Sequence, residues 1–146
     1  MSILFQEKPN KLTFRTYYFI NKYYMKSIQL VGYSTPVLID SIGWLEGEAN
    51  YTRIYYQNGT DTLVTQSLHW FEQHLDFIRV HRSTIVNPDF VAEFVHKSSR
   101  SGWVRLRNDR IIPVSRNRLD STTSRLAAIH HLNEQPNLLT NEQTVS

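Results

Sequence analysis

The stretch FIRVHRSTIVN, residues Phe77–Asn87, decides the fold, because two apolar segments in it enclose a polar triplet. Phe77–Val80 and Thr84–Val86 are rich in apolar and β-branched residues, which is typical of short buried strands. Between them stands the basic, hydrogen-bonding triplet His81-Arg82-Ser83. A buried strand does not need such a triplet, so the stretch indicates a polar site where two strands meet.

The strand period places His81 and Ser83 on one face and Arg82 on the other. We expect structural hydrogen bonds from His81 and Ser83, and from Asn87, which precedes a proline and can shape a turn. Arg82 is different, because a buried arginine needs a partner and no acidic residue lies nearby in the sequence. An exposed Arg82 at a strand end is free to contact a phosphate or the edge of a guanine.

Outward from this stretch, the chain continues as short strands. They are expected at Ser27–Val31, Val37–Ile39, Ile42–Leu45, Tyr51–Gln57, Thr62–Thr65, Phe90–His96, Trp103–Leu106 and Ile111–Val114. Asn58-Gly59, between two of them, is the strongest short hairpin signal. The segment Lys97–Gly102 is expected to be a loop between two others.

Two segments have a helical period instead. The apolar residues Leu68, Phe71 and Leu75 share one helical face and predict a helix over Ser67–Leu75, with Thr65 or Ser67 as its cap. From Ser115 onward the pattern is helical again, with the Ser115 hydroxyl expected to cap the helix. The expected fold class is therefore mainly β, with small antiparallel sheets, one or two short helices and a C-terminal helix.

The chain divides into three parts. Residues 1–26 form an aromatic and basic leader, residues 27–131 the patterned core, and residues 132–146 a polar tail that we expect to be disordered. The leader could pack on the core, mediate self-association, lie on a membrane surface or regulate the protein. Packing or self-association is favoured, because exposed aromatic side chains in such number are costly in water.

Composition limits the class of protein. A chain of 146 residues with 40% hydrophobic residues is one domain with a real core. Cysteine is absent, which rules out disulfides and thiolate chemistry and fits a cytoplasmic location. No apolar run approaches the roughly 20 residues of a membrane span, and the N-terminus lacks a signal-peptide pattern.

The charges separate along the chain. From Pro36 to Ile78 the acidic residues are Asp40, Glu46, Glu48, Asp61, Glu72 and Asp76, and the one base is Arg53. From Arg79 to Arg118 the bases are Arg79, Arg82, Lys97, Arg100, Arg105, Arg107, Arg110, Arg116 and Arg118, against Asp89, Glu93 and Asp109. Arginine is the side chain best suited to phosphate and guanine, so this half points to nucleic acid.

Two further segments carry polar groups at strand or helix ends. In PVSRNR, Arg116 and Arg118 follow Ser115 at a predicted helix N-terminus, where positive charge opposes the helix dipole unless an anion arrives. In EANYTR, Asn50 and Thr52 stand at the mouth of a strand. Asparagine can read adenine and threonine can contact bases or phosphates, although a simple turn explains either residue equally well.

Motifs of enzymes and metal proteins are missing from the sequence. The six histidines do not have the spacing of a metal site, and neither HExxH nor a cysteine ligand set occurs. No Walker A, GxGxxG or nucleophile elbow is present. We expect no catalysis, no cofactor, no metal and no small-molecule substrate.

The motifs in Ile42–Gly59, Thr65–Val91 and Ile111–Arg118 together resemble those of a LytTR DNA-binding domain. The resemblance depends chiefly on HRSTIVN followed by PVSR and extends from roughly Lys26 to Leu126. It implies an elongated arrangement of small antiparallel sheets whose loops, and not a recognition helix, enter successive major grooves. It also implies three contact positions. They are Thr52 (with Asn50, Tyr51 or Arg53 as neighbours), Arg82 and Arg116.

The sequence therefore predicts a sequence-specific regulator of transcription that binds double-stranded DNA. Further phosphate contacts are expected from Lys97, Arg100, Arg105, Arg107 and Arg118. Binding as a homodimer on repeated half-sites is compatible with this function.

Two alternatives stay open. The same fold could serve as a protein-interaction module through the leader, or bind single-stranded RNA on exposed Tyr55, Tyr56 or Trp103. Many relatives are response regulators with a receiver domain that is phosphorylated on aspartate. Residues 1–26 contain no aspartate, so we expect no such phosphorylation in this chain.

Overall fold

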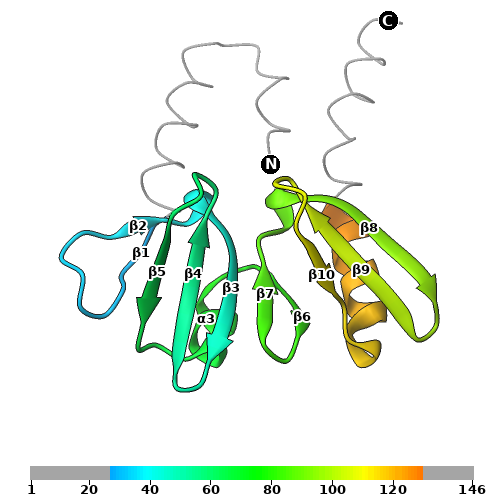
Figure 1. Ribbon diagram of the computed structural model, residues 1–146, viewed down its shortest axis with the longest axis horizontal. Coiled ribbons are helices and arrows are strands. Elements are labelled where there is room, and N and C mark those ends of the chain that lie inside the picture. The colour runs from blue at the N-terminus through cyan, green and yellow to red at the C-terminus, as the bar shows by residue number, and fades with distance from the viewer. Residues whose placement is uncertain (1–26, 130–146) are drawn as a thin grey trace, which may run out of the picture. The chain divides into compact units, whose positions relative to one another are not determined.

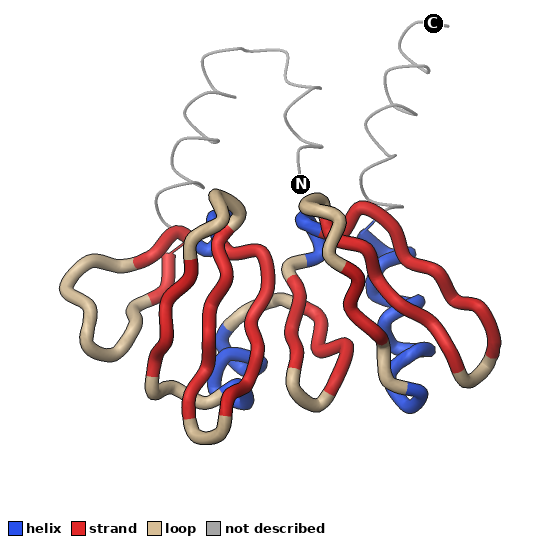
Figure 2. Tube along the Cα trace, viewed as in Figure 1, coloured by secondary structure: helices blue, strands red, loops and turns tan. Residues whose placement is uncertain are grey.

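The computed structural model describes residues 27–129, and the predictions made for residues 1–26 and 130–146 lie outside this range. Figure 1 shows the order of the elements, and Figure 2 shows that most of them are strands. The strands form three antiparallel sheets of two, five and three strands. The predicted fold class, mainly β with small antiparallel sheets, is confirmed.

The five-stranded sheet has the order β5-β4-β3-β7-β6. Its strands are β3 (Ile42–Glu48), β4 (Tyr51–Tyr56), β5 (Asp61–Val64), β6 (Ile78–His81) and β7 (Thr84–Val86). The stretch Phe77–Asn87 supplies its last two strands, and β7 pairs with β3, so that Leu45 lies opposite Ile85. The hairpin β6–β7 therefore completes the sheet that the preceding hairpins began.

The three-stranded sheet has the order β10-β9-β8 and follows directly in the chain. Its strands are β8 (Val91–Ser98), β9 (Ser101–Leu106) and β10 (Ile111–Pro113). A small ribbon of β1 (Ser27–Ile28) and β2 (Val37–Leu38) precedes the larger sheet. Short 3-10 turns occupy Ile39–Ser41 (η1), Pro88–Phe90 (η2) and Arg116–Arg118 (η3), and residues 119–129 are helical.

The helix α3 (Leu68–His74) packs on the core of the large sheet. Ser67 is its N-cap, since the Ser67 side chain accepts a hydrogen bond from the backbone N–H of Trp70 at 3.0 Å. Leu68 and Phe71 are buried in one cluster with Leu45 and Ile85 of the sheet. The apolar spacing that predicted this helix is the spacing of the face that it buries.

Several strand limits differ from those predicted. The strand expected at Ile42–Leu45 extends to Glu48, and β8 and β9 run through most of the expected loop Lys97–Gly102, which leaves only residues 99–100 as the turn. Cross-strand hydrogen bonds can extend a ladder through polar residues when one face stays buried, which local composition does not reveal. The strand expected at Ser27–Val31 is shorter and ends at Ile28.

Among residues 27–129, no helix has both the length and the hydrophobicity that crossing a membrane requires.

Candidate nucleic-acid interface

Four turns of residues 27–123 lie along one edge, the lower edge in Figure 1. They are the turn β3–β4, the turn β6–β7, the hairpin turn β8–β9, and the passage from β10 into η3. The opposite, upper edge holds the turns β4–β5 and β9–β10.

Backbone hydrogen bonds connect three of these lower turns. The N–H of Gly47 in β3 donates to the carbonyl of Ser83 in the turn β6–β7 at 2.9 Å. The N–H of Ser115, just before η3, donates to the carbonyl of Val80 in β6 at 2.8 Å. Segments more than 30 residues apart in the sequence are thus fixed side by side, and Figure 1 shows the same neighbourhood.

The turn β6–β7 presents Arg82 to solvent. Arg82 is exposed and, among the described residues, its guanidinium has no acidic partner. On the other face, Nδ1 of His81 lies 2.9 Å from Oγ of Ser83 and accepts a hydrogen bond from the N–H of Ser83 at 3.2 Å. The His81–Ser83 pair therefore shapes the turn from within, while Arg82 points to the outside.

Arg79 was not singled out by the sequence as a site residue, although it acts on the same turn. Its guanidinium donates to the carbonyls of His81 and Arg82 and to the carboxylate of Glu72 in α3. An arginine two residues before the triplet was visible in the sequence. Its partner Glu72 was not, because only the fold brings α3 next to β6.

The segment after β10 presents Arg116, which is exposed, and Arg118, which is half-buried. Neither has an acidic partner within the described residues. The expectation that the Ser115 hydroxyl caps the helix is wrong. Ser115 occupies the N-cap position, but its hydroxyl donates to Asn117 Oδ1 at 3.2 Å and lies 3.4 Å from the Val80 carbonyl. The first turn is a 3-10 turn, and the backbone N–H of Ser115 donates to Val80 of β6 instead of belonging to a helix cap.

The hairpin β8–β9 presents Lys97 and Arg100, both exposed. The ammonium of Lys97 lies over the ring of Trp103 at 5.9 Å from its centroid, and the backbone N–H of Arg100 donates to the Ser98 hydroxyl at 3.2 Å. In the part of the chain that the structure describes, neither cation meets a carboxylate.

The turn β3–β4 presents Asn50 and Tyr51, which are exposed, but neither Thr52 nor Arg53 is available for a contact. Thr52 is 0% exposed, and its hydroxyl has no hydrogen-bond partner in the described residues, so the side chain faces the core. The strand period explains this, because Thr52 shares a face with the buried Ile54. The expected contact of Thr52 with DNA therefore does not fit the structure.

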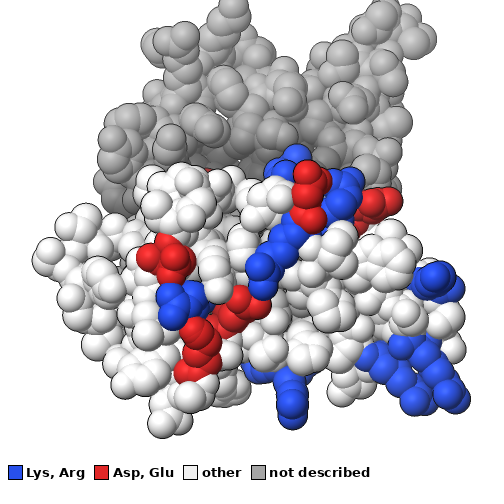
Figure 3. All heavy atoms as spheres, viewed as in Figure 1, with Lys and Arg blue, Asp and Glu red and all other residues white. Residues whose placement is uncertain are grey.

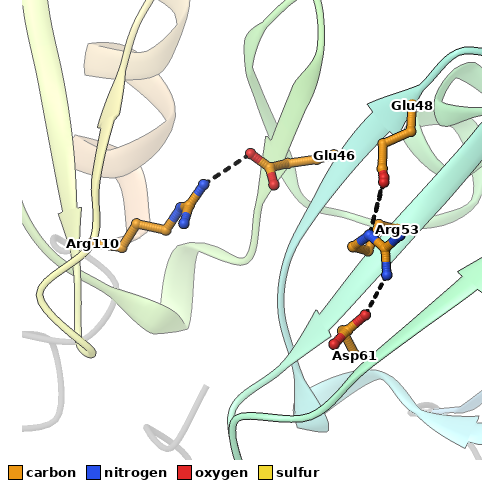
Figure 4. A network of polar contacts seen from close by, with 5 residues as sticks. All are labelled: Glu46, Glu48, Arg53, Asp61 and Arg110. Atoms are coloured by element: carbon orange, nitrogen blue, oxygen red, sulfur yellow. Dashed lines mark hydrogen bonds and ion pairs between the residues drawn. The ribbon is translucent and has the colours of Figure 1, made fainter.

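Arg53 is also unsuited to contact DNA. Its guanidinium donates to Glu48 at 2.8 Å and to Asp61 at 2.5 Å, as Figure 4 shows. Hydrogen bonds, first to Glu48 and then to Asp61, raise the pKa of Arg53 above its ordinary value. Two carboxylates for one cation make this site acidic overall, which would repel a phosphate.

The remaining arginines of the basic half are occupied as well. Arg105 pairs with Glu93 and Asp109, each at 3.2 Å, and Nε of Arg107 donates to the Asp89 carbonyl at 2.7 Å. A DNA phosphate would therefore have to compete with these internal partners for Arg105 and Arg107, which disfavours the predicted phosphate contacts. Both residues also lie toward the end of β9 that faces the upper edge.

Arg110 joins the three-stranded sheet to the five-stranded one. It donates to Glu46 at 3.2 Å (Figure 4), and its guanidinium lies 5.2 Å from the ring centroid of Trp44 and 5.9 Å from that of Tyr55. Burial raises the pKa of Tyr55, as does a hydrogen bond to Glu46. The ring of Tyr55 is stacked on that of Trp44 at 4.3 Å, so one of its faces is covered.

The cations therefore sort into two groups. The "free cations" are the exposed or half-buried bases whose charged groups meet neither a carboxylate nor a backbone carbonyl among the described residues, which leaves out Arg107. They are Arg82, Lys97, Arg100, Arg116 and Arg118. In Figure 3 blue atoms without red neighbours occupy the lower edge, whereas a blue group at the left stands among red ones. All the free cations belong to the turns of the lower edge.

Asn87 is structural. It is buried, its amide donates to the Ile42 carbonyl at 2.8 Å, and its side-chain oxygen accepts from the N–H of Asp89 at 2.9 Å. These bonds connect the end of β7 to the start of β3 and begin η2, which leads into the second sheet.

Comparisons with known proteins bear on the family and the fold of this chain. Comparison with the sequences of curated proteins gives no match. The structure is similar to that of the LytTr DNA-binding domain of a protein described as a methyl-accepting/DNA response regulator from Bacillus cereus, with a TM-score of 0.58 and 24% identity. The similarity covers 70% of this chain and 96% of that one and, at this identity, shows the fold alone. The profile of the family described as "LytTr DNA-binding domain" matches residues 32–127. Because that match covers well over half of the sequence, the protein belongs to the LytTR family of DNA-binding domains.

Proposed function

We propose that the protein is a regulator of transcription that recognises specific sequences of double-stranded DNA through the turns of its lower edge. Membership of a DNA-binding family, which is not a family of enzymes, is the starting point. The observation that carries the proposal is the sorting of the cations, since carboxylates hold Arg53, Arg79, Arg105 and Arg110, whereas the free cations occupy these turns.

Physical chemistry assigns each free cation a role. Arg82 and Arg116 stand at turn tips and donate bidentate hydrogen bonds to guanine, each worth about 1–3 kcal/mol of discrimination against a wrong base. Lys97, Arg100 and Arg118 neutralise phosphates, which strengthens binding to all sequences alike. Asn50, exposed in the turn β3–β4, adds a base or backbone contact.

The proposal assigns the groove contacts to turns because helix α3 does not present this charge. α3 is covered on one face by the core and holds Glu72 in the ion pair with Arg79. Turns that a sheet fixes at successive positions can enter successive major grooves. The proposal implies a cytoplasmic location if the protein is bacterial, because the bacterial chromosome lies in the cytoplasm.

The test begins with selection of bound duplexes from a random pool by the 146-residue protein. A short enriched motif supports sequence-specific binding, and two copies one helical turn apart would indicate a homodimer on repeated half-sites. No enrichment above the starting pool would contradict sequence specificity.

Variants then assign the roles. Arg82→Ala and Arg116→Ala should each lower affinity for the selected duplex by about 5- to 150-fold and relax the preference at one base pair. Arg107→Ala is the matched control, since it removes the same charge from a residue bound to the Asp89 carbonyl. If Arg82→Ala and Arg116→Ala bind the selected duplex as tightly as Arg107→Ala does, the proposed roles are wrong.

A further inference from the structure

The guanidinium of Arg79 fixes the backbone on both sides of Arg82. Nε of Arg79 donates to the His81 carbonyl at 2.9 Å, and Nη2 donates to the carbonyl of Arg82 itself. The first carbonyl belongs to the peptide between residues 81 and 82, and the second to the peptide between residues 82 and 83. Because each peptide is planar and rotates only about φ and ψ, holding both planes fixes the direction in which the Arg82 side chain leaves the turn.

The third bond of Arg79 connects the turn to helix α3. Nη1 donates to Glu72 Oε1 at 2.7 Å, and the Arg79 side chain is only 15% exposed. A planar guanidinium has its donors in fixed directions, so a carboxylate that holds one edge also orients the donors that reach the two carbonyls. Glu72 thereby sets the rotation of the group that holds the turn.

The other face of the turn is held independently. Nδ1 of His81 accepts from the N–H of Ser83, and the Ser83 carbonyl accepts from Gly47. Those bonds restrain Ser83 and the N–H of the peptide between residues 82 and 83, and Arg79 holds the carbonyl of that peptide and the carbonyl of the peptide before it. Arg79 is therefore the one side chain, among the described residues, that donates to both of these carbonyls.

We propose that Arg79, oriented by Glu72, is a positioning residue for base recognition by Arg82, so that helix α3 contributes to DNA specificity without touching DNA. The proposal depends on the proposed function, because it assumes that Arg82 reads a base. Arg79 does not bind DNA itself, since its side chain is only 15% exposed and three of its five N–H donors are occupied by two carbonyls and a carboxylate. Its loss lowers discrimination between sequences and leaves the general attraction to DNA unchanged.

The decisive variant is Arg79→Lys in the full chain, which keeps the charge and loses the fork of donors. The readout is the ratio of dissociation constants for random duplex and selected duplex at one salt concentration. We expect Arg79→Lys to lower this ratio at least about fivefold and to leave the affinity for random duplex within about twofold. Arg107→Lys is the control, because it makes the same exchange at an arginine that donates to the Asp89 carbonyl, away from the turn β6–β7. It should leave the ratio unchanged.

A double variant separates positioning from general damage. If Arg79 acts only through Arg82, then Arg79→Lys/Arg82→Ala should have the same ratio as Arg82→Ala alone, within about twofold. An additive loss in the double variant, or a ratio for Arg79→Lys equal to that of the unaltered protein, would overturn the proposal. If instead Arg82→Ala alone leaves the ratio unchanged, the failure lies with the proposed reading role of Arg82.

A second pair of variants keeps the test decisive if Arg79→Lys is unstable. Glu72→Ala should lower the ratio in the same direction, whereas Glu72→Gln keeps an acceptor oxygen for Arg79 and should restore most of it. Glu93→Ala is the charge-matched control, since Glu93 is an exposed carboxylate paired with Arg105 in the other sheet. Equal ratios for Glu72→Ala and Glu93→Ala would refute the contribution of α3.

Discussion

At the scale of single residues, the partner of an arginine and not its place in the charge pattern decides what it can do. Arg79 and Arg82 are three positions apart, yet one is 15% exposed and held by Glu72, while the other is exposed and free. Arg53 precedes both and is bound by two carboxylates. An arginine that already has a neutralising partner is not available to bind the phosphates of DNA, because binding would have to break the existing ion pair.

Thr52 gives a prediction at this scale. Its hydroxyl is buried without a hydrogen-bond partner in the described residues, so Thr52→Val keeps the shape and removes an unsatisfied polar group. We expect the free energy of unfolding to rise by about 1–2 kcal/mol in a urea titration, with unchanged affinity for DNA. Thr122→Val, at another buried threonine without a partner, is the control for stability alone. Weakened DNA binding by Thr52→Val would show that Thr52 makes the contact that its burial excludes.

The backbone of Ala49 gives a second prediction at the scale of single residues. Its φ is 53°, in the left-handed region, which costs a residue with a Cβ roughly 1–2 kcal/mol. Ala49→Gly removes this cost but adds entropy to the unfolded chain, so we expect a net gain of up to about 1 kcal/mol. Ala49→Val should lose stability instead. Thermal unfolding of both variants checks the order, and a valine variant as stable as the glycine variant would contradict it.

At the scale of elements, tight packing between β9 and the segment after β10 depends on one glycine. A Cβ on Gly102 would lie 2.7 Å from Leu119 Cδ2 and 2.8 Å from the backbone carbonyl oxygen of Val95. The side chain could move, but the carbonyl belongs to the neighbouring strand and cannot. Gly102 therefore allows Leu119, which is 1% exposed, to close the three-stranded sheet next to Arg116 and Arg118.

We therefore predict that Gly102→Ala lowers the free energy of unfolding by about 1–3 kcal/mol, as overpacking does elsewhere. Gly47→Ala is the matched control, since an added Cβ there would meet only ordinary contacts of 3.6 Å and more. Denaturant titration of both variants is the measurement. Equal stability of the two would mean that β8 shifts freely to accommodate the methyl group.

At the scale of the whole molecule, charge is separated by position and by pairing. Carboxylates of the five-stranded sheet pair with Arg53 and Arg110. The free cations, by contrast, occupy the turns of one edge. The net charge of +3 understates this separation, because five carboxylates pair with Arg53, Arg105 and Arg110 and not with the free cations.

The salt dependence of DNA binding tests this separation. Each phosphate contact adds about 0.9 to the slope of log affinity against log salt concentration. Lys97→Ala and Arg100→Ala should each flatten the slope by about 0.9, whereas Arg53→Ala and Arg105→Ala should leave it unchanged. Titrations at several salt concentrations give the slopes. A slope flattened as much by Arg105→Ala as by Lys97→Ala would show that ion-paired arginines also meet phosphates.

Much of the fold could be predicted from the sequence because its signals are local. The alternation of apolar residues, the Asn58-Gly59 turn and the spacing of Leu68, Phe71 and Leu75 each depend on a few neighbouring residues. The strand ends could not be predicted as well, because a ladder continues wherever a partner strand offers hydrogen bonds. Thr52 was misjudged for a related reason, since its position near a turn suggested exposure while the strand period buried it.

The sequence by itself determined the mainly β class, the family and the basic character of the second half, since each is written in residue types and short motifs. Only the tertiary structure decided which cations are available and which are neutralised, and it alone brought Glu72 to Arg79 and Val80 to Ser115. The physical reason is the range of the interactions along the chain. Secondary structure depends mostly on residues close in sequence, whereas ion pairs and buried hydrogen bonds depend on distances that only the folded chain sets.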